Sequence, residues 1–179
     1  MKKIEARLWV CLGLAVAILL TLGFIFGNSL KSPEASSDQS NEVVYLLRPL
    51  LDPNRKMSDE QFSHLIRKGA HFTEFCLLGI EAALLSFFLQ KKVTVGGVGL
   101  SAFFCLFAAN IDEYIQVFTD RGSQVQDVLL DFCGASTGIA LSLVVVSLVM
   151  LKIQKKKKLS FNSKEEANGG IQKHFRALL

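Results

Sequence analysis

The sequence predicts an all-α, polytopic membrane protein, and the distribution of its apolar residues leads to this fold class. Half of the 179 residues are hydrophobic. They gather in four long blocks instead of the short runs typical of a globular core, and the blocks cover residues 8–29, 71–90, 93–118 and 128–151. Each block is close to or above the roughly 20 residues that a helix needs to cross about 30 Å of hydrocarbon. We therefore expect four transmembrane helices.

A single membrane domain accounts for most of the chain. We expect it to span residues 1–151, which leaves no room for a soluble domain of ordinary size. The first apolar block follows a basic start, as in a signal peptide. It is longer than a typical signal-peptide core and no small-x-small cleavage site follows it, so we expect an uncleaved helix. Residues 152–179 combine a lysine cluster with a polar stretch, which predicts a basic, disordered cytoplasmic tail drawn to anionic headgroups.

The positions of Lys and Arg predict the orientation of the helices. Short basic segments precede the first block, join the second to the third and follow the fourth. Because Lys and Arg near helix ends stay mostly on the cytoplasmic side, we expect a multi-pass protein of the cell membrane with both termini in the cytoplasm. Arg67 and Lys68 then lie on the outer side, against this rule. Two explanations are open: ordinary snorkelling at a helix end, or binding of an anionic group.

The segment between the first two blocks is predicted to lie outside the membrane. Residues 32–41 are rich in Ser, Asp, Gln and Glu, which predicts a mobile loop. Residues 43–51 are mostly apolar, too short to span and broken by Pro49, which predicts an interfacial or re-entrant turn. Ser58 to Gln61 has the form of a capping box. We therefore expect an outer surface helix that bends at Gly69 into the second span.

Ionisable side chains lie within or beside the last three blocks, where a membrane-spanning segment normally carries none. A carboxylate or imidazole at bilayer depth costs a few kcal/mol or more, so it persists mainly where it faces a protein interior, a partner or water. We therefore expect a functional site in the outer half of the membrane. The candidate catalytic residues are His71, Glu74, Asp112 and Glu113, and the candidate substrate-binding residues are Lys68, Gln116, Arg121, Ser123, Asp127 and Asp131.

Helical periodicity sorts these residues onto faces, because each residue advances about 100° around the axis. In the third block the polar residues share one face, and the opposite, lipid-facing side is predicted to carry Phe103, Phe104, Phe107 and Phe118. In the fourth block one stripe contains Asp127, Asp131, Gly134, Gly138 and Ser142. A Gly-xxx-Gly spacing lets two helix backbones approach closely in lipid, so we expect this stripe to pack against a neighbouring helix.

Four motifs appear in a fixed order along the chain: Lys68-xx-His71-Phe-x-Glu74-Phe, Asp112-Glu113-xx-Gln116-x-Phe, Arg121-x-Ser123-xxx-Asp127 and Gly134-xxx-Gly138. In this order and spacing they resemble the VanZ-like family of small bacterial membrane proteins, and the resemblance covers roughly residues 68–138. It implies a place in the cell envelope of Gram-positive bacteria and an association with low-level teicoplanin resistance. It implies no established reaction.

Two positions depart from the usual pattern of this family. Phe75 stands where the family commonly has Tyr, which removes a hydroxyl from the predicted site. Asp131 stands where the family commonly has Asn, which adds a negative charge. The substrate or the protonation pattern could therefore differ from that of other members.

Three interpretations of the charged cluster are open. In an enzyme, His71 or Glu74 acts as general acid or base, a divalent cation is held by Asp112, Glu113 and Asp127, and a lipid phosphate is clamped by Lys68 and Arg121. In a binding or transport protein, the same cleft holds a lipid-linked envelope precursor, or the acyl chain of the glycolipid drug, without chemistry. In a scaffold, a buried ion-pair network only fixes the packing of the helices.

Several motif classes are absent from the sequence. It contains no Gly-rich phosphate loop, Gly-x-Ser-x-Gly elbow or His-Glu-xx-His motif, which excludes several enzyme classes. Its four cysteines form no CxxC motif or Cys/His cluster, so they support neither a disulfide framework nor a zinc site. We expect membrane lipids or a lipid-linked envelope precursor as partners, and no nucleic acid.

Overall fold

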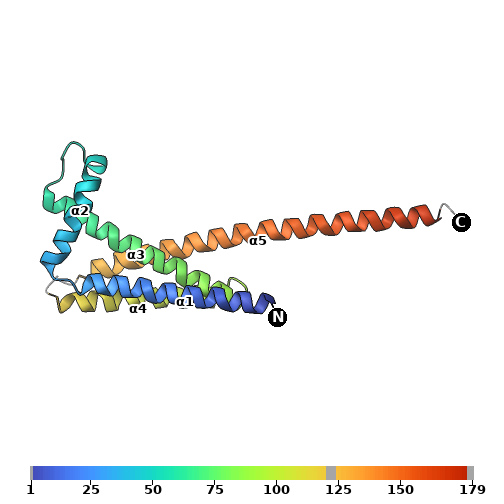
Figure 1. Ribbon diagram of the computed structural model, residues 1–179, viewed down its shortest axis with the longest axis horizontal. Helices are drawn as coiled ribbons and strands as arrows, with labels where there is room; N and C mark the ends of the chain where they lie inside the picture. The colour runs from blue at the N-terminus through green and yellow to red at the C-terminus, as the bar shows by residue number, and fades with distance from the viewer. Residues whose placement is uncertain (1, 120–123, 177–179) are drawn as a thin grey trace. The chain divides into compact units, whose positions relative to one another are not determined.

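The protein is built of long helices in a computed structural model that describes residues 2–119 and 124–176 (Figure 1). Over these residues the elements are α1 (Lys2–Ser29), α2 (Pro33–Leu51), α3 (Asp59–Gln90), α4 (Val95–Val117) and α5 (Val125–Arg176). The stretches long and apolar enough to cross a membrane are Ile4–Ser29, Asp59–Gln90, Val95–Val117 and Val125–Leu159. The predicted class, an all-α polytopic membrane protein with four long apolar helices, is confirmed.

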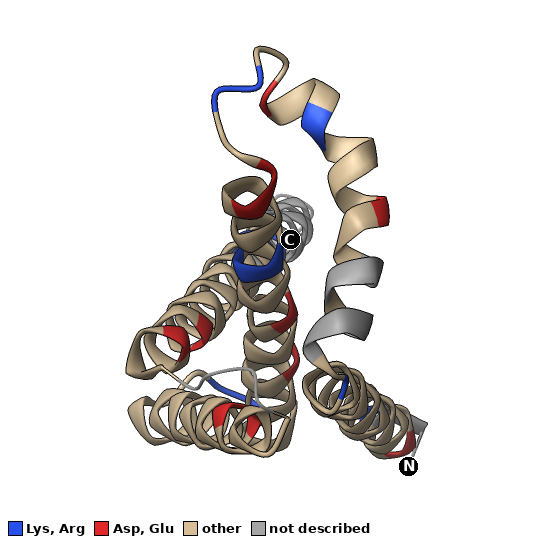
Figure 2. Ribbon diagram, turned by 90° about the vertical axis from the view of Figure 1, so that its left-hand side faces the viewer, with Lys and Arg blue, Asp and Glu red and all other residues tan. Residues whose placement is uncertain are grey.

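The chain divides into two compact units, Met1–Ser142 and Leu143–Leu179. In the first unit, α1 and α4 end where α3 and α5 begin, and α2 lies at this same end against α3 (Figure 1). The turn between α3 and α4 lies at the other end (Figure 1). Figure 2 looks onto the end that carries α2, with the acidic positions of α3, α4 and α5 in red. The fold therefore brings the chain segments that hold the predicted site residues to one end of the unit.

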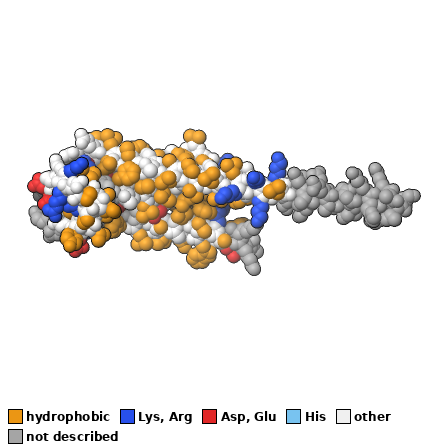
Figure 3. All heavy atoms as spheres, turned by 90° about the horizontal axis from the view of Figure 1, so that it is seen from above, with side chains coloured by type: hydrophobic (Ala, Val, Ile, Leu, Met, Phe, Trp, Pro, Cys, Tyr) orange, Lys and Arg blue, Asp and Glu red, His pale blue; other side chains and the backbone are white. Residues whose placement is uncertain are grey.

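The core of the first unit draws residues from four helices. It contains Ile18 and Ile25 of α1, Phe75 and Leu78 of α3, and Cys105, Ala108 and Ala109 of α4, with Ala82 of α3 and Ala135 of α5. Many large hydrophobic side chains point outward instead, and they cover much of the surface seen in Figure 3. An apolar exterior of this size is expected where lipid is the solvent.

The aromatic face predicted for the third span is largely confirmed on α4. Phe103, Phe107 and Phe118 are exposed, with 67%, 57% and 70% of their surface accessible. Phe104 is an exception, because it packs partly buried against the core. Asp112, Glu113 and Gln116 are buried on the inner side of α4, so the helix has the two-sided character that its sequence predicts.

Helices α3 and α5 approach each other along a seam of small residues, which we call the glycine seam and which consists of Gly79, Gly134 and Gly138. A Cβ atom added to Gly138 would overlap the backbone carbonyl of Cys76, and one added to Gly134 would overlap that of Phe72. A Cβ atom on Gly79 would overlap the carbonyl of Ala135. The close packing predicted from the Gly-xxx-Gly spacing is therefore present in the structure.

The segment between the first two predicted spans differs from its prediction, because residues 33–51 form one continuous helix, α2, in place of a loop and a turn. Pro33 occupies the first position of α2, where a proline costs little since its fixed φ suits a helix and no N–H is needed. Pro49 lies in the last turn, and α2 ends two residues later. The polar composition of residues 32–41 therefore does not prevent a helix.

Helix α3 also begins earlier than the span predicted at residue 71. The capping box is confirmed: Ser58 Oγ accepts a hydrogen bond from Gln61 N at 3.2 Å, and Gln61 Oε1 accepts one from Ser58 N at 3.1 Å. From Asp59 the helix runs through Gly69 to Gln90 without interruption. A glycine inside a helix costs only about 1 kcal/mol, so the cap and the flanking residues are sufficient to continue it.

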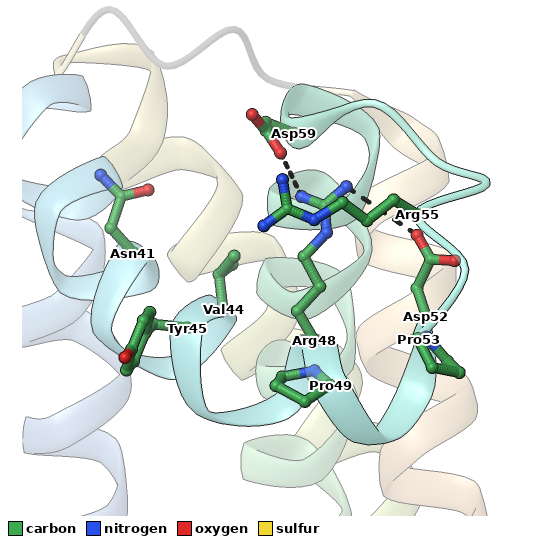
Figure 4. A pocket seen from close by; sticks show the side chains of 9 residues that line it. All are labelled: Asn41, Val44, Tyr45, Arg48, Pro49, Asp52, Pro53, Arg55 and Asp59. Carbon is green, nitrogen blue, oxygen red and sulfur yellow. Dashed lines mark hydrogen bonds and ion pairs between the residues drawn. The ribbon is translucent and has the colours of Figure 1, made fainter.

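The junction between α2 and α3 is organised around Arg48 (Figure 4). Its guanidinium forms ion pairs with Asp59 and, at 3.8 Å, with Asp52, donates to the Met57 carbonyl and lies 5.2 Å from the centroid of the Phe62 ring. Asp52 accepts hydrogen bonds from the backbone N–H groups of Lys56 and Met57, and these bonds hold the pKa of its carboxyl below the usual value. The recess of about 460 Å³ beside Arg48 is thus lined by groups that already serve the fold.

The second unit continues α5 beyond Ser142. Helix α5 extends to Arg176, whereas the sequence predicted a span that ends at residue 151 and a disordered tail from residue 152 to 179. Lys, Gln, Leu and Glu, which are common in this stretch, all favour helix, so the charge run does not interrupt α5. The lysines of the cluster, Lys152 and Lys155 to Lys158, are exposed.

Candidate functional site

A fully buried carboxylate, Asp112, lies near the end of α4. Its Oδ1 accepts a hydrogen bond of 2.6 Å from Ser29 Oγ of α1, and its Oδ2 accepts one of 2.9 Å from Gln116 Nε2 one turn further along α4. Ser29 is also fully buried, and its carbonyl accepts from Thr119 Oγ1 at 3.2 Å. The ends of α1 and α4 are thus joined by polar contacts that orient Asp112.

A histidine from α3 and a second carboxylate from α5 complete this cluster. His71 Nδ1 lies 3.7 Å from Asp112 Oδ2 and 3.9 Å from Asp131 Oδ1. Asp131 is fully buried, and neither of its carboxylate oxygens has a hydrogen-bond partner among the described residues. We call His71, Asp112 and Asp131 the His–Asp centre. Together with Ser29, it draws one polar residue from each of the four spanning helices.

The His–Asp centre has the composition of a metal or acid–base site. Each of its three residues offers one ligand atom, and these atoms all lie within 4.8 Å of one another. An imidazole beside a carboxylate can also accept or donate a proton while the carboxylate stabilises its charged form. The arrangement therefore allows both kinds of chemistry.

The cation ligands predicted from the sequence are only partly brought together. Glu113 Oε1 accepts a hydrogen bond of 2.6 Å from the backbone N–H of Gln124, and Asp127 Oδ1 forms an ion pair of 2.7 Å with Lys68 Nζ. Both residues therefore serve other contacts, and the structure groups Asp112 with His71 and Asp131 instead. The pair of Lys68 and Asp127 is about 30% exposed and lies at the rim of the site.

A cleft of about 200 Å³ opens between α1, α2 and α3 and reaches the His–Asp centre from one side. One wall is polar and consists of Asn28 together with Arg67, His71 and Glu74, which follow one face of α3 at helical spacing. Asn28 Nδ2 donates to Glu74 Oε1 at 3.3 Å. The remaining walls include the apolar residues Phe24, Val43 and Ile66. His71 lines the cleft and also forms part of the centre.

The other predicted residues have separate places. Glu81 of α3 is buried and accepts a hydrogen bond of 3.1 Å from Thr21 Oγ1. Phe75, one of the two departures from the family pattern, is fully buried in the apolar core instead of the cleft. Arg121 and Ser123 lie outside the described residues.

Three residues of the site were not among the sequence-predicted candidates: Asn28, Ser29 and Arg67. Asn28 and Ser29 end α1, and polar residues at the end of an apolar block are common without any function. Only the depth at which Ser29 is buried distinguishes it. The predicted orientation puts Arg67 on the side of the membrane that basic residues disfavour, and this anomaly is the signal that could have identified it.

Comparisons with known proteins place this arrangement in a family. A family model described as VanZ/LLP1 matches residues 14–148, a range that includes all residues of the His–Asp centre and the residues of the cleft. No curated protein and no solved structure matches the chain.

Proposed function

Because the chain belongs to the VanZ/LLP1 family, we propose that it acts on the cell envelope from the outer leaflet of the bacterial cell membrane. There its cleft binds the anionic headgroup of a lipid or of a lipid-linked envelope precursor. Binding or processing of this molecule would lower the sensitivity of the cell to teicoplanin. The resemblance of the four sequence motifs to the VanZ-like family supports the effect on teicoplanin sensitivity.

The observation that carries this proposal is the two-sided lining of the cleft. A lipid phosphate needs cationic and hydrogen-bonding groups, and its chain needs an apolar wall. Arg67 and His71 supply the first kind of group, and Phe24, Val43 and Ile66 supply the second. A cleft that combines both linings within about 200 Å³ suits the junction of a headgroup with its chain better than either part alone.

In this proposal His71 has a second role as a proton donor or acceptor. Its side chain lines the cleft, and its Nδ1 faces the carboxylates of Asp112 and Asp131. A neighbouring carboxylate orients an imidazole and stabilises its protonated form, which in turn attracts an anion. Removal of the imidazole should therefore weaken headgroup binding and stop any proton transfer.

Orientation in the membrane is the remaining element of the proposal. The basic segments at the α3–α4 turn, Lys91 and Lys92, and in the second unit favour a cytoplasmic location for those parts of the chain. In the first unit the cleft lies at the end opposite the α3–α4 turn (Figure 1). This orientation would open the cleft to the outer leaflet.

Binding to purified protein in lipid nanodiscs tests the proposal, with polyprenyl phosphate as the anionic probe and uncharged polyprenol as its control. Arg67→Gln and His71→Gln should each weaken phosphate binding by about tenfold or more, because each removes a hydrogen bond to a charged group worth about 1.5–3 kcal/mol. Arg55→Gln, a matched change at an exposed arginine outside this cleft, should leave binding unchanged.

Three outcomes decide the proposal. Equal affinity for the phosphate and the alcohol would contradict an anionic headgroup site. A fall in melting temperature that accompanies the loss of binding in both cleft variants would favour a structural ion-pair network instead. Turnover of the phosphate by the wild-type protein, absent in His71→Gln, would distinguish an enzyme from a binding or transport protein.

A further inference from the structure

We infer that the His–Asp centre binds one divalent transition-metal ion, with Zn²⁺ as the best match. The ligands would be His71 Nδ1 and one carboxylate oxygen each from Asp112 and Asp131. The role of such an ion in the cell rests on the proposed function, whereas its binding can be measured alone.

The spacing of the three ligand atoms supports an ion of this size. Zinc binds imidazole nitrogen and carboxylate oxygen at about 2.0–2.2 Å, so two ligands of a tetrahedral site are about 3.4 Å apart. The two distances from His71 Nδ1 are 3.7 and 3.9 Å. All three ligand atoms lie within 4.8 Å of one another, so small rotations of the side chains would bring them to binding distance.

A second and independent observation is the condition of Asp131. Its side chain is fully buried, and both oxygens are without a hydrogen-bond donor among the described residues. A buried carboxylate in this condition is costly, and a bound cation removes that cost. Asp112 differs, because Ser29 and Gln116 hold it in place as outer-shell partners commonly hold a metal ligand.

Ligand chemistry selects among the divalent ions. Two carboxylates carry two negative charges, which one divalent ion neutralises. Mg²⁺ and Ca²⁺ prefer oxygen ligands throughout, whereas an imidazole favours Zn²⁺ and related transition metals. A site with three protein ligands also keeps a coordination position open, as catalytic zinc sites do. That position would suit a phosphate oxygen of the molecule bound in the cleft.

Metal binding by the full-length protein in nanodiscs tests this inference. Protein stripped with a chelator would be dialysed against Zn²⁺ alone and analysed for bound metal, with Co²⁺ absorption spectra as a report on coordination. We expect one Zn²⁺ per chain. Asp131→Asn, Asp112→Asn and His71→Gln should each weaken binding more than the roughly 10- to 100-fold that loss of an outer-shell partner costs.

Two matched controls separate the centre from general affinity for metal. Glu81→Gln removes a buried carboxylate of α3 outside the centre, one oxygen of which also lacks a hydrogen-bond partner among the described residues. His64→Gln removes an exposed imidazole of the same helix. Both should retain the bound ion. Zn²⁺ should also raise the melting temperature of the wild-type protein more than Mg²⁺ or Ca²⁺ does, which gives a readout even if a centre variant fails to fold.

The outcomes are distinct from those of the proposed function. Failure of the wild-type protein to bind Zn²⁺ stoichiometrically would overturn the inference, and so would equal binding by all three centre variants. Zn²⁺ binding without polyprenyl phosphate binding would support the metal site and contradict the headgroup site. Phosphate binding by a wild-type protein that does not bind Zn²⁺ would support the headgroup site and contradict the metal site.

Discussion

At the scale of single residues, the contact between Ser29 and Asp112 is central to the site. Ser29 Oγ donates to Asp112 Oδ1 at 2.6 Å, and both side chains are fully buried. The bond joins residues 83 positions apart in the chain. It therefore fixes the position of a charged group and ties the end of α1 to α4 at the same time.

Replacement of this hydroxyl should be costly. Ser29→Ala leaves the buried Asp112 with one hydrogen-bond donor fewer, and a bond to a charged group contributes about 1.5–3 kcal/mol. We expect the free energy of unfolding, measured by reversible denaturation in detergent, to fall by that amount. Thr137→Ala is the control, because this exposed hydroxyl donates to the Cys133 carbonyl of its own helix, at 2.8 Å. A loss at Thr137 equal to that at Ser29 would contradict a special role for the buried bond.

The residues of the His–Asp centre differ from Ser29 in how well the sequence predicts them. His71, Asp112 and Asp131 are recognisable in the sequence because charge at bilayer depth is rare. Their grouping is not predictable in the same way, since helical periodicity places residues on a face but does not say which neighbour that face meets. Ser29 lacks any such signal, because a serine at the end of an apolar block carries no cost that would mark it.

At the scale of elements, the glycine seam makes the packing of α3 on α5 depend on the absence of a side chain. The atoms that a Cβ on Gly138 would meet belong to the backbone of Cys76 and Ile80, which cannot move aside as a flexible side chain can. Even the smallest substitution must therefore separate the two helices.

Gly138→Ala should consequently destabilise the protein by about 1–3 kcal/mol or more, the usual range for overpacking, and Gly138→Leu should lower the folded yield further. Ala140→Leu is the control, because Ala140 is exposed on α5 and a larger side chain there should change stability by no more than about 0.5 kcal/mol. Folded yield by size-exclusion chromatography and melting temperature measure both effects. Similar behaviour at the two positions would mean that the seam does not determine the packing.

Helix α2 is the element that the sequence predicts least well. Ser, Asp and Pro are loop-favouring on average, but Pro33 at the first position of a helix and a following stretch without glycine are compatible with helix. The helical state of α2 is supported by its contact with α3, and the sequence does not reveal this contact. The long apolar blocks are predicted well, in contrast, because length and hydrophobicity alone determine a span.

At the scale of the whole molecule, the orientation in the membrane follows from the basic segments and remains a prediction. Asn54, in the connection between α2 and α3, and Lys92, in the turn between α3 and α4, are both exposed. They lie at opposite ends of the spans in the first unit, so they report the orientation directly.

In a background without the four native cysteines, Asn54→Cys should react with a membrane-impermeant thiol reagent added to intact cells. Lys92→Cys should react only after the cells are opened. The physical reason is the preference of Lys and Arg near helix ends for the cytoplasmic side. The reversed pattern of labelling would place the cleft on the cytoplasmic side and would contradict the proposed action at the outer leaflet.

The glycine seam has one more consequence, which concerns what can vary in such a molecule. Gly134 meets the backbone of Phe72, the residue next to His71, so the separation of His71 from Asp131 is set by main-chain contact. The side chains on the lipid-facing surface take no part in this main-chain contact. The exterior of the bundle can therefore be altered to suit bilayers of different thickness or composition, and the spacing within the His–Asp centre stays the same.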